Sequence, residues 1–102
     1  MLDLCTGTGT VVLKFAAGNS KVKVFGVDRS AGMLRVARHK RGKQRIKNLK
    51  LCLMDATQLG FQDKNFDKVL ISLVLHEMEE EFAEKLILEA KRVLKDEGEF
   101  TT

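Results

Sequence analysis

Residue types and segments that often define a protein's class are scarce in this chain. Its 102 residues contain no proline, tryptophan or tyrosine and only two cysteines, Cys5 and Cys52. Two thiols are too few for a disulfide framework, and their spacing does not suit a zinc site. No apolar run approaches the ~20 residues that a membrane-spanning helix needs, and the N-terminus lacks the pattern of a secretory signal. We therefore expect a cytoplasmic protein with neither a membrane span nor a metal centre.

The remaining composition is that of one globular domain. Hydrophobic residues make up 44% and charged residues 31% of the chain, and the length is close to the commonest size of a single domain. We expect strands at residues 2–5, 22–28, 49–54 and 66–74 and after Gly98, and helices from Val11 to Gly18, from Ser30 onward and from about 80 to 95. Alternating strands and helices predict an α/β fold, a Rossmann-like open parallel sheet of about five strands with flanking helices.

The sequence LDLCTGTGT at residues 2–10 joins the first expected strand to the first helix. In a parallel α/β sheet, ligands bind beyond the carboxyl ends of the strands. Gly7 and Gly9 lack a Cβ there, so the backbone can approach a ligand closely and point its N–H groups toward it. Asp28 ends the second strand, 21 residues after Gly7, where a carboxylate can accept hydrogen bonds from both hydroxyls of a ribose. The alternative is a tight strand-to-helix turn followed by a surface aspartate.

Two phosphate-binding patterns are absent from the sequence. Val12 stands where a dinucleotide fingerprint has its third glycine, and no glycine-rich phosphate loop with its lysine occurs. An adenosine compound without a pyrophosphate is therefore favoured as the ligand. Asp55 ends the third strand, where its carboxylate would accept a hydrogen bond from an adenine amino group. Together, the glycines and acids at successive strand ends predict a nucleoside ligand.

Five segments together resemble the successive motifs of class I S-adenosylmethionine-dependent methyltransferases. They are LDLCTGTG (2–9), VFGVDRSAGML (24–34), LMDATQLGF (53–61), FDKVLISLVLHEM (66–78) and AKRVLKDEGEF (90–100). The resemblance spans nearly the whole chain and is nearest to the ubiquinone/menaquinone-biosynthesis C-methyltransferase-like group. It implies that residues 1–102 form an S-adenosylmethionine-binding methyltransferase core, which acts on a small-molecule acceptor.

The resemblance also implies roles for individual residues. The turn after the first strand would hold the methionyl end of the cofactor, through Asp3, Cys5, Thr6, Gly7 and Gly9. The adenosine would lie at the next two strand ends, with Asp28 at the ribose hydroxyls, Arg29 and Met33 beside the adenine, Asp55 at its amino group and the Ala56 N–H close by. Ser72, at the end of the fourth strand, would lie near the cofactor's amino group and methyl.

The chain departs from the family pattern in its turn and in its length. Cys5 stands where the usual turn has its first glycine. The family fold resembles a seven-stranded sheet preceded by a helix, so we expect this chain to lack the leading helix and the last two strands. An uncovered apolar face and an unpaired strand edge favour self-association. We therefore expect a truncated core that forms a homodimer, or aggregates, through that face or edge.

No catalytic constellation is evident in the sequence. Methyl transfer from a sulfonium depends mainly on positioning and exclusion of water, and only some acceptors need a general base. His76 is the one candidate base, just beyond the fourth strand, and its alternative role is to cap an ordinary strand-to-helix turn. A second possible function is therefore a non-catalytic module that binds S-adenosylmethionine without turnover.

A basic stretch suggests a third function. The sequence RHKRGKQRIKNLK (38–50) holds seven lysines and arginines in 13 residues, which is enough to neutralise several phosphates of an RNA that the protein binds or modifies. The chain has only six phenylalanines to stack on bases, and most of them occupy expected core positions. We favour instead a solvated helix end, whose lysines are attracted to the helix C-terminus, and expect no nucleic-acid partner.

Overall fold

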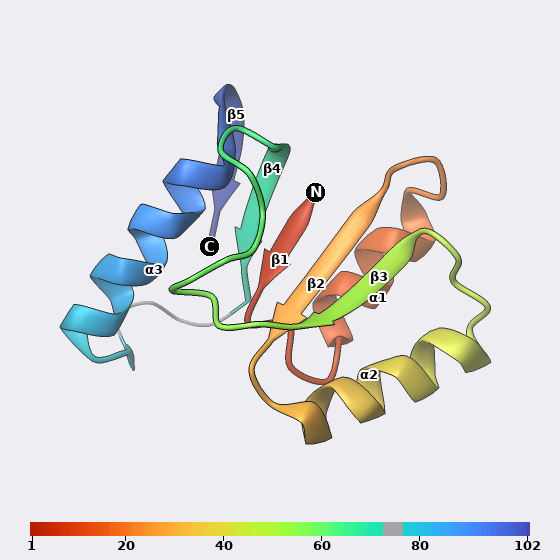
Figure 1. Ribbon diagram of the computed structural model, residues 1–102. Coiled ribbons are helices and arrows are strands. Elements are labelled where there is room, and N and C mark those ends of the chain that lie inside the picture. Colours follow the sequence, from red (N-terminus) through yellow and green to blue (C-terminus); the bar gives the residue numbers. More distant parts are fainter. Residues whose placement is uncertain (73–76) are drawn as a thin grey trace.

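The computed structural model describes residues 1–72 and 77–102, which form one five-stranded sheet (Figure 1). The strands are β1 (Leu2–Leu4), β2 (Val24–Asp28), β3 (Leu49–Leu53), β4 (Phe66–Ile71) and β5 (Leu94–Thr101). Neighbouring strands are all parallel, and their order across the sheet is β3-β2-β1-β4-β5. The chain therefore moves outward from β1 to β3 and then from β4 to β5 on the other side. The expected Rossmann-like α/β sheet is confirmed, and its switch point lies between β1 and β4.

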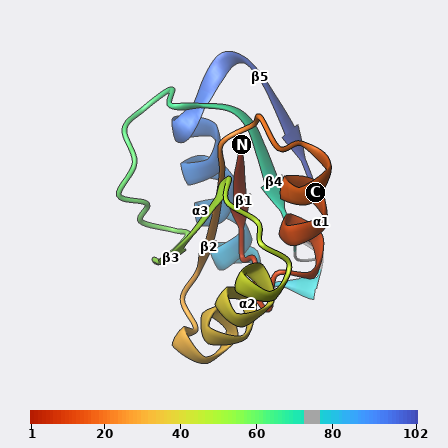
Figure 2. The same cartoon turned by 90° about the vertical axis from the view of Figure 1, so that its right-hand side faces the viewer.

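Within the described residues, three helices cover the two faces of this sheet. The helices α1 (Thr10–Gly18) and α2 (Ala31–Lys43) pack on one face, and α3 (Glu80–Val93) packs on the other (Figure 2). The Ser30 hydroxyl accepts the Met33 N–H at 3.2 Å, so α2 begins at the cap that the sequence predicted. None of the three helices is both long enough and apolar enough to cross a lipid bilayer.

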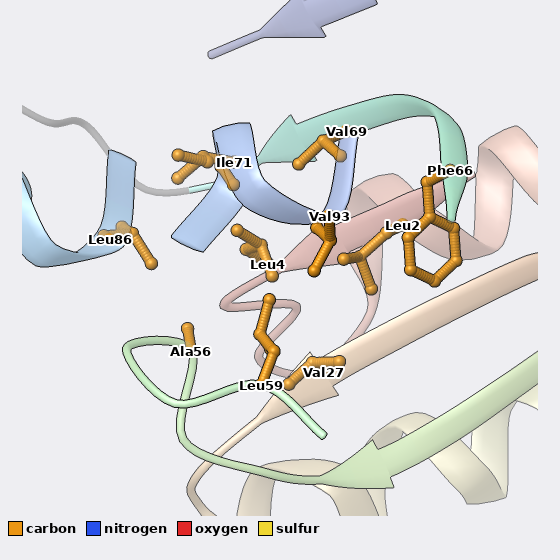
Figure 3. Packing of buried hydrophobic residues seen from close by; sticks show 11 residues of the cluster. Leu2, Leu4, Val27, Ala56, Leu59, Phe66, Val69, Ile71, Leu86 and Val93 are labelled. Atoms are coloured by element: carbon orange, nitrogen blue, oxygen red, sulfur yellow. The ribbon is translucent and has the colours of Figure 1, made fainter. Parts of the chain in front are cut away.

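The two faces of the sheet have separate hydrophobic clusters. Figure 3 shows the cluster beneath α3, in which Leu2 and Leu4 of β1 lie near Val93 and Ile71. The cluster beneath α1 and α2 contains Met1, Val12, Leu13, Ala16, Val24, Leu34, Ala37, Leu49 and Leu51. Full burial of one such leucine or valine contributes about 1.5–3 kcal/mol. Leu2 and Leu4 of β1 belong to the first cluster and Met1, directly before β1, belongs to the second, and all three residues of this short strand are buried.

The connection between β3 and β4, residues 54–65, lies over the α3 side of the sheet. The Phe61 ring contacts Phe25 and Phe66 edge to face, with ring centroids 5.5 Å and 4.9 Å apart. Leu59 of the same connection is buried beside Val27 and Leu4 (Figure 3). This connection therefore covers part of the face on which an uncovered apolar surface was expected.

Part of the basic stretch lies along the outer edge of β3. The Arg41 guanidinium donates to the Leu49 carbonyl at 3.1 Å, and the Arg38 guanidinium is 3.5 Å from the Leu51 carbonyl. The last turn of α2 carries three basic side chains, as expected for a helix end. These arginines occupy hydrogen-bonding groups that an added strand would otherwise use, so the β3 edge is protected.

The predicted element boundaries are correct to within a few residues, with one exception. The first strand ends at Leu4 rather than Cys5, and the second begins at Val24 rather than Val22. The end of the predicted fourth strand, residues 73–74, lies outside the described residues. The exception is β5, which begins at Leu94 directly after α3 instead of after Gly98. Leu94 pairs with Phe66 of β4, and this long-range pairing decides where the helix gives way to the strand.

Candidate functional site

The turn from Cys5 to Gly9 lies at the carboxyl edge of the sheet, between β1 and α1. Cys5, Gly7 and Gly9 all adopt the left-handed region, with φ values of 60°, 58° and 86°. Glycine adopts this conformation without strain, whereas Cys5 does so at a cost of about 1–2 kcal/mol. A Cβ on Gly9 would lie 3.0 Å from Leu13 and 3.2 Å from Ala37. Gly9 therefore allows α1 to start in close contact with α2.

Asp28 joins this turn to the end of β2. One carboxylate oxygen accepts the Gly7 N–H at 2.8 Å, and the other accepts the Ser30 N–H at 2.9 Å. The Thr6 N–H also bonds the Val27 carbonyl at 2.9 Å. Each carboxylate oxygen has two acceptor positions, so both Asp28 oxygens retain capacity for a ligand hydroxyl. The sequence predicted both residues at neighbouring strand ends, and the structure adds a direct hydrogen bond between them.

Asp3 is the most buried carboxyl group of the site. Its side chain is fully buried, and its two oxygens accept the Thr6 hydroxyl at 2.5 Å and the Ser72 hydroxyl at 2.6 Å. Burial raises the pKa of Asp3 above its ordinary value, the two hydroxyl hydrogen bonds oppose that rise, and the nearby charge of Asp28 adds to it. Asp3 therefore holds the β1 turn against the end of β4.

A pocket of about 120 Å³ opens beside these residues. Among the described residues its walls are Cys5, Asp28, Arg29, Met54, Ala56 and Phe82. They come from the ends of β1 and β2, from the start of the 54–65 connection and from the first half of α3. Asp28 and Arg29 are the charged residues of this lining, and Met54, Ala56 and Phe82 are apolar.

The Cys5 thiol is part of this pocket but is not poised to react. Burial raises its pKa to about 11, and the negative charges of Asp28 and Asp3 contribute to the rise. The thiol is therefore protonated at neutral pH, and a protonated thiol is neither a nucleophile nor a metal ligand. Cys5 serves as a small wall residue.

Seven of the predicted site residues do not line this pocket: Asp3, Thr6, Gly7, Gly9, Met33, Asp55 and Ser72. The Asp55 carboxylate accepts both the N–H and the hydroxyl of Thr57, at 2.8 Å and 2.7 Å. These two bonds lower the pKa of Asp55, and they direct the carboxylate toward its own turn. Met33, which the resemblance implies would lie beside the adenine, is 48% exposed. Its sulfur lies 3.6 Å from the point that a Cβ on Gly7 would occupy, at the rim of the turn.

The structure adds two wall residues that the sequence analysis did not name as site residues. Met54 directly precedes Asp55, so its position after the third strand was available as a signal. Phe82 lies on the predicted apolar face of the last helix, and only the packing of α3 brings it to the pocket. The candidate base His76 lies outside the described residues.

Comparison with known proteins identifies the family. Residues 1–102 match a family described as a methyltransferase domain. The chain belongs to this family. It is 37% identical over 99 residues to a demethylmenaquinone methyltransferase of Staphylococcus aureus, a match that covers 95% of this chain and 39% of that protein. The predicted resemblance to class I S-adenosylmethionine-dependent methyltransferases of the menaquinone group is confirmed.

Solved structures agree on the architecture. An S-adenosylmethionine-dependent methyltransferase from Aquifex aeolicus superposes with a TM-score of 0.79 and 27% identity, covering 92% of this chain and 50% of that one. The cyclase SpnF superposes with a TM-score of 0.81 and 28% identity, covering 92% and 34%. The chain thus spans about two fifths of the curated relatives it matches, and the fold also occurs in a protein named for a different reaction.

Proposed function

We propose that this chain is the cofactor-binding core of a methyltransferase and holds S-adenosylmethionine across the carboxyl ends of β1, β2 and β4. The observation that carries the proposal is the Asp28 carboxylate, which is tied to the Gly7 and Ser30 N–H groups and faces the pocket. A carboxylate fixed in this way is already oriented to accept ribose hydroxyls, so little side-chain freedom is lost on binding.

The residues present fit the adenosine part of that cofactor. Met54, Ala56 and Phe82 offer apolar walls to a flat ring, and Asp28 offers acceptors to its sugar. Pockets that enclose a whole small ligand measure about 300–1,000 Å³. The volume of about 120 Å³ therefore suits one part of the cofactor, and the rest would lie along the open strand ends. Asp55 would contact the adenine amino group only if it released Thr57.

The other end of the site suits a cationic group. When bound, the cofactor supplies a methyl group activated by its sulfonium centre. Asp3 and Asp28 place two carboxyl groups near the turn, and Ser72 fixes one of them. Their negative charge favours the amino group and the sulfonium of the methionyl part, and their hydrogen bonds keep them from reorienting. The chain's own contribution is thus to bind and orient.

We further propose a small-molecule acceptor. The Staphylococcus aureus relative carries the name demethylmenaquinone methyltransferase, and this supports an acceptor of the quinone class. Transfer of the labelled methyl group of S-adenosylmethionine to demethylmenaquinone would support an enzyme. Cofactor binding without any transfer would favour the alternative of a non-catalytic binding module.

A cytoplasmic location and a homodimer also remain proposals. Both cysteines are free thiols, which agrees with a reducing compartment. β5 forms one edge of the sheet and is the edge at which two copies would pair, because Arg38 and Arg41 occupy the β3 edge. Sedimentation velocity over a range of concentrations tests the dimer, and a single species of monomer mass at every concentration would contradict it.

Calorimetric titration with S-adenosylhomocysteine tests the binding proposal. We expect Asp28→Ala to weaken binding about 10-fold or more, because one charge-assisted hydrogen bond contributes about 1.5–3 kcal/mol. Asp67→Ala is the matched control, since Asp67 is an exposed carboxylate at the opposite end of β4 that pairs with Lys95. Equal affinities in Asp28→Ala and the parent chain would contradict the placement of the ribose at Asp28. Binding of NAD without any binding of S-adenosylhomocysteine would exclude S-adenosylmethionine as the cofactor.

A further inference from the structure

An ion pair on α3 contacts the backbone of the 54–65 connection. The Arg92 guanidinium bonds the Glu89 carboxylate twice, Nε to Oε1 at 2.6 Å and Nη2 to Oε2 at 3.0 Å. The pair then holds both backbone polar groups of Leu59: Glu89 Oε2 accepts the Leu59 N–H at 2.7 Å, and Arg92 Nη2 donates to the Leu59 carbonyl at 3.1 Å. We call this four-bond arrangement the Glu89–Arg92 clamp.

The clamp extends along the connection beyond Leu59. Arg92 Nη1 donates to the Phe61 carbonyl at 3.0 Å and to the Asp63 carboxylate at 2.7 Å. The Lys64 N–H returns a bond to the Arg92 carbonyl at 2.9 Å. All of these bonds join α3 to one segment that is about 30 residues away in the chain.

Burial distinguishes the clamp from an ordinary surface ion pair. The side chain of Glu89 is 17% exposed and that of Arg92 is 32% exposed. The other ion pair within α3, Lys85 with Glu81, is 60% and 71% exposed and does not reach the connection. Exposed pairs of that kind contribute little, whereas bidentate and partly buried pairs hold their geometry.

One contact and one short turn link the clamped segment to the pocket. The Gly60 N–H, between the two carbonyls that Arg92 holds, lies 3.3 Å from the sulfur of the pocket-wall residue Met54. Three residues before Leu59, Ala56 forms another part of the wall. The turn between them is fixed, since the Gln58 N–H bonds the Asp55 carbonyl at 3.0 Å. Displacement of Leu59 would therefore displace both walls.

The helix α3 also contributes a residue to the wall of the pocket. Phe82 lines the pocket from the first half of α3, about 15 Å along the helix axis from Arg92 at 1.5 Å per residue. The clamp thus sets the distance between the Phe82 wall and the Met54 and Ala56 walls, although neither of its two residues touches the pocket.

We propose that Glu89 and Arg92 are positioning residues of the cofactor pocket, which they shape by locking the 54–65 connection to α3. This inference rests on the proposed function, because the effect concerns binding of an adenosyl compound at that pocket. Loosening the clamp lets the connection leave its docked position. The apparent affinity then falls in proportion to the fraction of molecules in which the connection is docked.

The test compares Arg92→Gln, Arg92→Lys and the control Lys85→Gln by calorimetric titration with S-adenosylhomocysteine. Urea unfolding of each variant establishes conditions in which all are folded. We expect Arg92→Gln to weaken binding about 10-fold. This is the loss of apparent affinity that results if the connection is docked in only about a tenth of the molecules. Hydrogen exchange at the Leu59 amide should accelerate, and Lys85→Gln should stay within about 2-fold of the parent chain.

Arg92→Lys separates positioning from a purely structural role. Lysine restores the charge beside Glu89, so stability should largely recover. It lacks the planar fork that reaches the Leu59 and Phe61 carbonyls together, so the affinity should stay weakened. Affinity that recovers along with stability, or an unchanged affinity in Arg92→Gln, would overturn the inference. If the parent chain itself fails to bind S-adenosylhomocysteine, the proposed function fails, and this inference fails with it.

Discussion

At the scale of single residues, Asp3 opposes folding through its charge rather than through its packing. Asp3 is fully buried, and desolvation of a carboxylate opposes folding unless hydrogen bonds offset it. The Thr6 and Ser72 hydroxyls provide two such bonds, yet the pKa of Asp3 remains raised. A buried carboxyl group of this kind is a candidate for a role in binding, because natural sequences tend to accept lower stability where binding requires it.

We predict that Asp3→Asn increases the free energy of unfolding at pH 7. The folded-state pKa of Asp3 lies above its ordinary value, so the parent chain gains stability as pH falls through that raised pKa. The advantage of the asparagine variant should therefore shrink in acid. Urea unfolding across this pH range measures it, and Asp96→Asn, which removes an exposed carboxylate, should change little.

The same substitution should weaken binding of S-adenosylhomocysteine about 10-fold, because the negative charge that favours the amino group of the ligand is lost. A variant that is more stable and binds equally well would show that Asp3 serves the fold alone. Sequence spacing predicted that Gly7 follows the first strand and that Asp28 ends the second, and both residues have these positions in the fold. It could not identify Phe82, whose place depends on how α3 packs.

At the scale of the elements, β5 is the irregular strand. Its pairing with β4 shifts register, from Phe66 opposite Leu94 to Lys68 opposite Glu99, so β5 has extra residues between these two points. Gly98 lies in this bulge. A Cβ on Gly98 would lie 2.5 Å from Leu94 Cδ1 and 2.9 Å from the Asp67 carbonyl oxygen, so the bulge requires a glycine.

We predict that Gly98→Ala destabilises the protein by about 1–3 kcal/mol, the usual cost of overpacking. Gly42→Ala is the matched control, because Gly42 lies within α2 and a Cβ there would meet no atom within 4 Å. That control should be stabilising by up to about 1 kcal/mol, since alanine is the better helix former. Thermal unfolding measures both variants, and equal shifts in the two would contradict this description of the bulge.

Helix starts were predictable and the beginning of β5 was not. Ser30 caps α2 through a bond to the Met33 N–H, a local interaction that its position before an apolar face reveals. The end of α3 has no comparable local signal, because Leu94 continues the apolar face of the helix. Pairing with Phe66 across the sheet converts Leu94 to a strand residue.

At the scale of the whole molecule, a fall in pH should affect stability in two opposite ways. Some carboxyl groups have a lowered pKa in the fold, and Asp3 has a raised one. Hydrogen bonds from Arg92 lower the pKa of Glu89, and those from Thr57 lower the pKa of Asp55. Groups with a lowered pKa stabilise the fold at neutral pH, and this contribution is lost as pH falls through the folded-state pKa. Asp3 acts in the opposite direction, because its pKa is raised.

We predict that Glu89→Gln lowers the free energy of unfolding at pH 7 by about 1.5–3 kcal/mol, the range for hydrogen bonds to a charged group. The difference from the parent chain should disappear well below pH 4.5, the ordinary pKa of the glutamate, where Glu89 is protonated. Urea unfolding at both pH values measures it. Glu81→Gln on the same helix is the control, because it removes only an exposed ion pair, and it should change stability by about 0.3–0.5 kcal/mol. A loss of stability in Glu89→Gln that does not depend on pH would contradict the prediction.

The sequence by itself determined the alternation of strands and helices, the glycine turn, the acidic strand ends and the methyltransferase family. The first three depend on spacing along short stretches, where periodicity and backbone conformation act locally, and the family resemblance combines five such segments. The tertiary structure alone decided how the 54–65 connection covers the sheet, which residues form the pocket walls and which ion pair holds them. Those features join residues far apart in the chain, such as Leu59 with Glu89 and Asp3 with Ser72, and such contacts form only when the sheet has brought its elements together.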